Sequence, residues 1–110
     1  MTGNYKYGRD KEQKVANALR NKGASVRVSR GSKSAVDLKV VFPSGTKWNI
    51  QVKSSRSKIV APPTSKEVGR LKQGAINSSA TAVIAKVTPE GIEYESASTG
   101  RTLMPPKRRK

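Results

Sequence analysis

The chain has 110 residues, with 23 lysines and arginines against 7 aspartates and glutamates, and its formal net charge is +16. A single small domain with this charge is expected to bind a polyanion, and nucleic acid is the first candidate because neutralised phosphates release counterions. With no cysteine and no histidine, the sequence excludes disulfides, zinc sites and histidine acid–base chemistry, so a metal cofactor would be a hard cation held by oxygen atoms, Mg²⁺ or Mn²⁺.

The first predicted element is a helix over about residues 7–21, which ends at Lys22-Gly23. Its apolar stripe consists of Val15, Ala16 and Leu19, and Glu12 occupies the same side one turn earlier. A glutamate that continues an apolar stripe either reaches for water at the helix end or is held inward for a purpose. The pattern alone leaves both interpretations open.

Strands are predicted at about 25–30, 36–42 and 47–54, and the turn at 42–46 joins the last two into a hairpin. Because strand side chains alternate, Asp37, Gln51 and Lys53 are expected on one surface of this hairpin. The opposite surface takes the apolar residues of both strands, which are Val36, Leu38, Val40, Trp48, Ile50 and Val52. A carboxylate, an amide oxygen and a lysine can hold a divalent cation against a phosphate. The alternative is a ribbon with one solvated face.

The second half continues with a loop at 55–63, a helix at 65–76 and paired strands at about 81–87 and 92–95. The apolar face of this helix is predicted to comprise Val68, Leu71, Ala75 and Ile76. Glu67, near the helix start, is given a structural role because an acid there favours the helix dipole. Residues 1–99 are predicted to form one domain and residues 100–110 a flexible basic tail that adds phosphate affinity.

Several motifs, in this order, resemble archaeal-type Holliday junction resolvases of the PD-(D/E)XK nuclease superfamily. They are Gly8-Arg9-Asp10-Lys11-Glu12-Gln13-Lys14-Val15, Gly23 with Val26-Arg27-Val28, Gly31-Ser32-Lys33-Ser34, Val36-Asp37 and Ile50-Gln51-Val52-Lys53-Ser54. The resemblance covers roughly residues 7–57, and the remainder agrees only in general layout. It implies a restriction-endonuclease-like α/β fold, in which a mixed central sheet is flanked by helices.

The resemblance also implies roles for individual residues. Glu12 and Asp37 match the acids that bind metal, Gln51 stands where a glutamate is usual, and the carbonyl of Val52 would complete the shell around Mg²⁺ or Mn²⁺. Lys53 matches the motif lysine, and Ser32 matches a loop serine that contacts the scissile strand. Phosphate-backbone contacts are expected from the remaining polar and basic positions, which are Arg9, Arg27, Arg30, Lys33, Ser34, Arg56 and Lys58.

Together these features predict a metal-dependent endonuclease that resolves four-way DNA junctions by paired phosphodiester hydrolysis. Two opposed cuts call for a two-fold homodimer. Gln51 is neutral, so this site would have one negative charge fewer than usual and a lower metal affinity. The alternatives are a non-catalytic basic nucleic-acid-binding protein and a nuclease of the same fold with another DNA substrate. We expect an intracellular protein, cytoplasmic or nucleoid-associated, with no membrane partner, because no apolar run approaches about 20 residues and no signal peptide is visible. A small-molecule substrate is not expected either.

Overall fold

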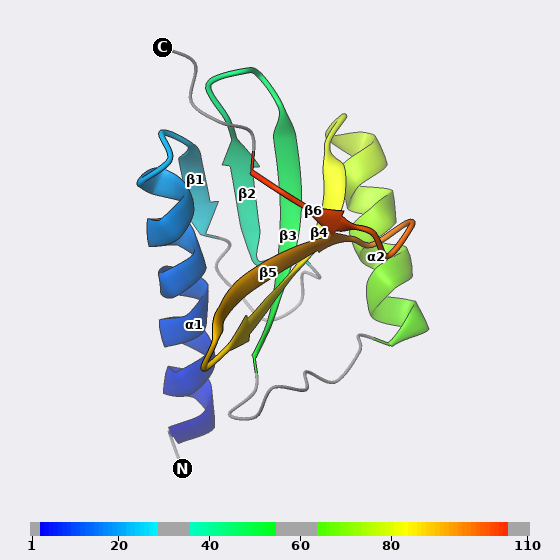
Figure 1. Ribbon diagram of the computed structural model, residues 1–110. Coiled ribbons are helices and arrows are strands. Elements are labelled where there is room, and N and C mark those ends of the chain that lie inside the picture. Colours follow the sequence, from blue (N-terminus) through cyan, green and yellow to red (C-terminus); the bar gives the residue numbers. More distant parts are fainter. Residues whose placement is uncertain (1–2, 29–35, 55–63, 106–110) are drawn as a thin grey trace.

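A six-stranded sheet forms the centre of the computed structural model, which describes residues 3–28, 36–54 and 64–105, with side chains from residue 10 onward (Figure 1). The strands lie side by side in chain order, as β1 (Ser25–Val28), β2 (Leu38–Val41), β3 (Lys47–Ser54), β4 (Thr81–Thr88), β5 (Gly91–Ser96) and β6 (Thr102–Leu103). Neighbours are antiparallel except β3 and β4, which run parallel. A parallel pair needs a crossover connection, and α2 (Ser65–Asn77) provides it.

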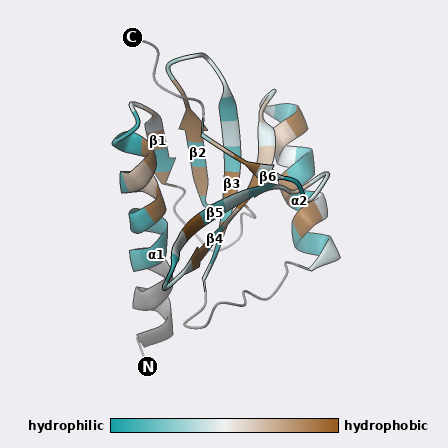
Figure 2. Ribbon diagram, in the orientation of Figure 1, coloured by the Kyte–Doolittle hydropathy of each residue, from teal (hydrophilic) through white to brown (hydrophobic). Residues whose placement is uncertain are grey.

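The two helices cover opposite faces of the sheet. Along β4, Val83 and Ala85 belong to the larger core cluster, whereas Ala82 and Ile84 belong to the smaller one. Because alternate residues of a strand face opposite ways, the two clusters lie on the two sides of the sheet. The helix α1 (Gly3–Arg20) packs on the larger cluster, and α2 packs on the smaller one. In Figure 2, α2 and the coloured part of α1 both alternate between hydrophilic and hydrophobic residues, as expected for helices with one buried side.

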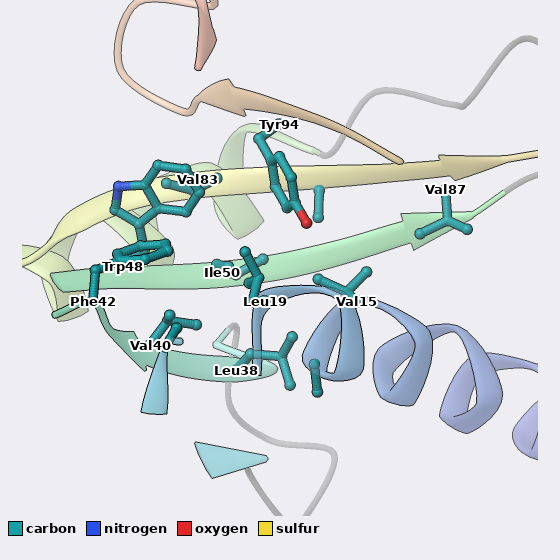
Figure 3. Close-up of a cluster of buried hydrophobic side chains, with 13 residues drawn as sticks. Val15, Leu19, Leu38, Val40, Phe42, Trp48, Ile50, Val83, Val87 and Tyr94 are labelled. Carbon is teal, nitrogen blue, oxygen red and sulfur yellow. The ribbon is translucent and has the colours of Figure 1, made fainter. Parts of the chain in front are cut away.

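The core beneath α1 is built around aromatic rings. Trp48 meets Phe42 edge to face at a centroid distance of 4.8 Å, and the centroid of the Tyr94 ring lies 5.5 Å from that of Trp48. Figure 3 shows Val15 and Leu19 of α1 pointing into this cluster. The burial of these residues confirms the predicted apolar stripe on the first helix. Within the same cluster, burial raises the pKa of Tyr94 to about 12.

The predicted C-terminal end of the first helix and the hairpin turn are also confirmed by their hydrogen bonds, whereas α1 begins at Gly3, earlier than the start predicted near residue 7. At the end of α1, Gly23 has a φ of 91° and the amide of Ala24 donates to the carbonyl of Leu19 at 3.1 Å, which is a glycine-terminated helix end. In the hairpin between β2 and β3, the amide of Phe42 donates to the carbonyl of Thr46 at 2.8 Å. The hairpin therefore has the register that alternation requires.

The structure corrects three expectations. Val36 packs in the smaller cluster beneath α2 and not beside Leu38, because the chain bends at Asp37 before β2 begins. Ile76 is 71% exposed, so it is not part of the buried face of α2, which consists of Leu71 and Ala75 with Val68 packed against the same cluster. A short strand that the sequence did not predict, β6, pairs with β5 inside the segment assigned to the tail. Within the described ranges, neither helix is long and apolar enough to cross a membrane.

Candidate active site

One side of β3 carries the polar residues of the candidate site. Trp48 and Ile50 lie in the core beneath α1, and Val52 packs against it. Alternation therefore turns Asn49, Gln51 and Lys53 toward the face that α2 covers. The prediction that Gln51 and Lys53 share one surface, opposite the apolar residues of β3, is confirmed.

Glu67 of α2 joins Gln51 and Lys53. Its Oε2 atom accepts a hydrogen bond from Nε2 of Gln51 at 3.0 Å and another from Nζ of Lys53 at 2.9 Å. Its other oxygen, Oε1, accepts from the amide of Thr64 at 3.0 Å, while the hydroxyl of Thr64 caps the amide of Glu67 at 3.2 Å. This reciprocal capping box confirms the structural role predicted for Glu67. The contacts with β3 add a role that the sequence did not predict.

The carboxylate of Glu67 sits in a strongly favourable environment. The hydrogen bond from the Thr64 amide and the one from Lys53 lower the pKa of Glu67 to about 2. Lys53 lies directly opposite Lys86 in the parallel register of β3 and β4, and Lys86 is paired with Glu95 at 3.0 Å. Like charges directly opposite each other on paired strands repel. Here each of the two lysines forms an ion pair with its own acid, which offsets that repulsion.

Asp37 occupies the point where the β2–β3 ladder ends. Its amide donates to the carbonyl of Ile50 at 2.8 Å, and its Oδ2 atom accepts from the amide of Val52, also at 2.8 Å. A side-chain carboxylate thus takes the place of a backbone carbonyl beside β3. Burial raises the pKa of Asp37, while the Val52 amide and the charge of Lys53 act against this rise and the charge of Glu67 adds to it. Because its carboxylate is hydrogen-bonded to the amide of Val52, Asp37 lies beside the stretch of β3 that carries Gln51 and Lys53.

Two amide groups on this side of β3 are buried without complete hydrogen bonding. Gln51 is 6% exposed and Asn49 3% exposed. Oε1 of Gln51 and Nδ2 of Asn49 have no hydrogen-bond partner in the described part of the chain. A buried polar atom without a partner costs about 1–3 kcal/mol, so such atoms are uncommon and often mark a site for an ion or water. The orphaned oxygen of Gln51 is an atom that a hard cation can bind.

The described residues contain no group of three or more histidine, cysteine, aspartate or glutamate side chains that could hold a metal ion. A cation at this site would therefore depend on amide or backbone oxygens as well as carboxylates. The side-chain oxygen Oε1 of Gln51 and the carboxylate of Asp37 are oxygen ligands of the required kinds. The predicted roles of the Gln51 side chain and the Val52 carbonyl as ligands stay predictions.

Glu12 lies on α1, half-buried and one turn before Val15 and Ala16. It is therefore on the side of α1 that packs on the sheet, whereas Gln51, Lys53 and Glu67 lie on the face that α2 covers. Its convergence with Asp37 around one ion stays a prediction. Arg9 also belongs to α1, but its side chain lies outside the described residues.

Among the predicted DNA contacts, Arg27 is an exposed residue of β1. It pairs across the strands with Lys39 of β2, which is also exposed and which sequence reasoning missed. Val26 and Val28 pack toward the α1 core, so Arg27 and Lys39 face the same way as Lys53. The other predicted contacts lie outside the described residues, and they are Arg30, Ser32, Lys33, Ser34, Arg56 and Lys58.

The position of Glu67 had a signal in the sequence. A helix that connects two parallel strands runs back along the first strand, so its first turn lies beside that strand's carboxyl end. Thr64 and Glu67 form a capping-box pair at the start of just such a helix. Recognising β3–α2–β4 as a parallel crossover would therefore have placed Glu67 beside Lys53.

No family model matches the sequence, and no curated protein matches it either. The fold is similar to that of Hjc, a Holliday junction resolvase from the archaeal hyperthermophile Archaeoglobus fulgidus, with a TM-score of 0.73. The two chains are 18% identical, and the match covers 86% of this chain and 84% of the other. The chain therefore has the restriction-endonuclease-like α/β fold of that resolvase, as the resemblance implied.

Proposed function

We propose that the chain is a metal-dependent, structure-specific DNA endonuclease that resolves four-way junctions. The observation that carries this proposal is the cluster of Gln51, Lys53 and Glu67 beside Asp37, on a fold shared with a junction resolvase. A solvated ribbon would need neither a buried glutamine with an orphaned oxygen nor a carboxylate whose charge burial disfavours.

Asp37 and Oε1 of Gln51 would hold Mg²⁺ or Mn²⁺, with the carbonyl of Val52 as a further ligand. Glu12, which the resemblance assigns to the same shell, lies on the side of α1 that packs on the other face of the sheet, so this proposal does not depend on it. The orphaned Gln51 oxygen supports this assignment, because an amide carbonyl is an acceptable ligand for hard cations. The chemistry that such a cation supplies is polarisation of a phosphoryl oxygen and a lower pKa for bound water.

Lys53 is the second residue with a direct role in the proposed reaction. Its ammonium group is held at 2.9 Å by Glu67 and retains 29% of its side-chain exposure, so it is fixed in place and still accessible to substrate. From this position it orients the attacking water and stabilises the negative charge that develops on the phosphate.

A cationic strip on β1 and β2 supports a DNA partner. Arg27 and Lys39 are exposed on the sheet face that also carries Lys53. Such charges bind phosphates without reading sequence, which suits a substrate recognised by its shape. Two opposed cuts in a junction require two such sites, so the functional unit is a homodimer.

The decisive experiment is cleavage of a four-way junction in Mg²⁺ by the full chain and by Asp37→Asn and Lys53→Ala. Both variants are expected to retain junction binding while cleavage falls by about 10²-fold or more. Asn at position 37 keeps a side-chain oxygen for the Val52 amide, so the end of the ladder survives while the negative charge is lost.

Matched controls are Lys72→Ala on the exposed surface of α2 and a linear duplex of the same sequence. The lysine control should cleave like the unmodified chain, and the duplex should remain intact. Equal cleavage by all proteins would refute the assigned site. Tight binding without cleavage in any metal would identify a non-catalytic DNA-binding protein, and cleavage of the duplex would indicate a nuclease with another duty.

A further inference from the structure

We propose that Glu67 is a positioning residue that fixes the Gln51 amide with its carbonyl oxygen free for the cation. This inference rests on the proposed function, because it deepens the assignment of the same site. Glu67 then has a second role besides helix capping, which is to orient the polar side chains of β3.

The orientation of Gln51 follows from the chemistry of its partner. An ionised carboxylate only accepts hydrogen bonds, whereas a glutamine side chain has a donating end and an accepting end. Contact with Glu67 at 3.0 Å therefore requires that Nε2 of Gln51 faces the carboxylate. The other end, Oε1, must then face away, and it is buried without a partner in the described part of the chain. Without Glu67, no described contact would distinguish the two ends of this amide.

The carboxylate of Glu67 is itself held rigidly. Its Oε1 atom accepts from both the amide and the hydroxyl of Thr64, at 3.0 and 3.3 Å. Its Oε2 atom contacts Gln51 and Lys53 together. The start of α2 thus sets the positions of two side chains on β3, and groups that orient a metal ligand in this way commonly alter affinity by about 10–100-fold.

Glu67 also supplies the charge that position 51 lacks. Gln51 brings a neutral oxygen to the site, and its hydrogen bond places a carboxylate directly behind it. The negative charge that a glutamate at position 51 would carry is supplied instead by Glu67 on the neighbouring helix α2. Gln51 and Glu67 then act as one unit, and exchanging their side chains should preserve that unit.

The test measures Mn²⁺ binding by electron paramagnetic resonance on the full chain without DNA. Glu67→Gln should weaken Mn²⁺ binding by about tenfold. Glutamine is compatible with a capping box, so the melting temperature without metal should change little. Glu93→Gln, an exposed glutamate on β5, is the matched control for loss of one negative charge and should bind Mn²⁺ like the unmodified chain.

The exchange variant separates positioning from a general charge effect. Gln51→Glu alone brings two carboxylates together and should lower the melting temperature in the absence of metal. The double variant Gln51→Glu/Glu67→Gln restores the acid–amide contact in reverse, so it should recover both the melting temperature and Mn²⁺ binding. The two changes are therefore expected to be strongly non-additive.

Several outcomes would overturn the inference: no Mn²⁺ binding by the unmodified chain, equal Mn²⁺ binding by Glu67→Gln and Glu93→Gln, or purely additive effects in the double variant. Because these measurements use no DNA, they are independent of cleavage. A chain that cleaves junctions but binds Mn²⁺ normally after Glu67→Gln would retain the proposed function and lose this inference. A chain that cleaves no DNA but shows the exchange effect would retain the inference and lose the nuclease.

Discussion

The two faces of the sheet differ in composition although the same strand supplies both. Beneath α1, β3 contributes Trp48 and Ile50 to a cluster of apolar side chains. Beneath α2, the alternate residues Asn49, Gln51 and Lys53 meet a smaller apolar cluster and the carboxylate of Glu67. One face consists of closely packed apolar groups, and the other buries two amides with unpaired atoms.

The contrast between the two faces shows how a domain of 110 residues can support a polar site. Apolar burial is the main favourable term in folding, while each unpaired buried polar atom works against it. Concentrating the aromatic residues beneath α1 allows the α2 face to hold amides and charges. Stability and proposed chemistry are therefore assigned to opposite sides of β3, and this assignment can be broken by mutation.

The largest effect is expected from Trp48→Ala. Trp48 is 4% exposed and contacts two aromatic rings, so its truncation should reduce the free energy of unfolding by about 3–5 kcal/mol. Denaturation in urea measures this loss. At a temperature where the variant stays folded, its junction cleavage should match that of the unmodified chain.

Ile76→Ala provides the apolar control for that measurement. Ile76 is 71% exposed on α2, so its truncation should change the free energy of unfolding by less than about 0.5 kcal/mol. If Trp48→Ala were equally mild, or if it abolished cleavage while the protein remained folded, the separation between the two faces would be wrong.

An intermediate effect is expected on DNA binding. Arg27→Ala and Lys39→Ala remove cations from the exposed strip beside the site. Each should weaken junction binding severalfold, and each should reduce the slope of log affinity against log salt by about 1. Fluorescence anisotropy at several salt concentrations measures both quantities.

Lys14→Ala is the matched control, because Lys14 is an exposed cation on α1, which covers the other face. Its loss should leave the salt slope nearly unchanged. Equal losses for all three variants would mean that DNA responds to the overall charge of +16 and not to one face of the sheet.

Much of this arrangement could be predicted from alternation along the strands. The hairpin, the sharing of one surface by Gln51 and Lys53, and the stripe of α1 all follow from period-two and period-3.6 patterns. The bend at Asp37 could not be predicted, because a side chain that bonds the Val52 amide replaces a ladder contact there. That single bend moves Val36 to the cluster beneath α2.

The remaining misses concern contacts between segments distant in sequence. Glu67 lies 14 residues from Lys53 in the chain, and local patterns identify only its capping role. Ile76 fits the helical period, but it falls at the end of α2 with its side chain exposed. Periodicity indicates which side of an element is buried, and it does not show where the neighbouring element stops covering it.

The smallest effect is expected from a change in pH, because the contributions of Glu67 and Asp37 to folding stability change in opposite directions as the pH falls. The pKa of Glu67 is lowered from 4.5 to about 2, so its stabilising contribution is complete above about pH 4.5 and is lost as the pH falls toward 2. The pKa of Asp37 is raised from 3.8, so its contribution is complete below that value and is lost as the pH rises. Because Glu67 is about one-third exposed, solvent screening keeps its effect below about 1 kcal/mol.

Urea midpoints at about pH 5 and about pH 2.5 test these signs. Acidification should lower the midpoint less for Glu67→Gln than for the unmodified chain, because that variant has no ionised Glu67 to lose. It should lower the midpoint more for Asp37→Asn, because that variant lacks a group that favours the folded state at low pH. Equal shifts in all three proteins would mean that neither carboxylate is specifically held, and the contacts of Asp37 and Glu67 with β3 would then contribute nothing measurable to stability.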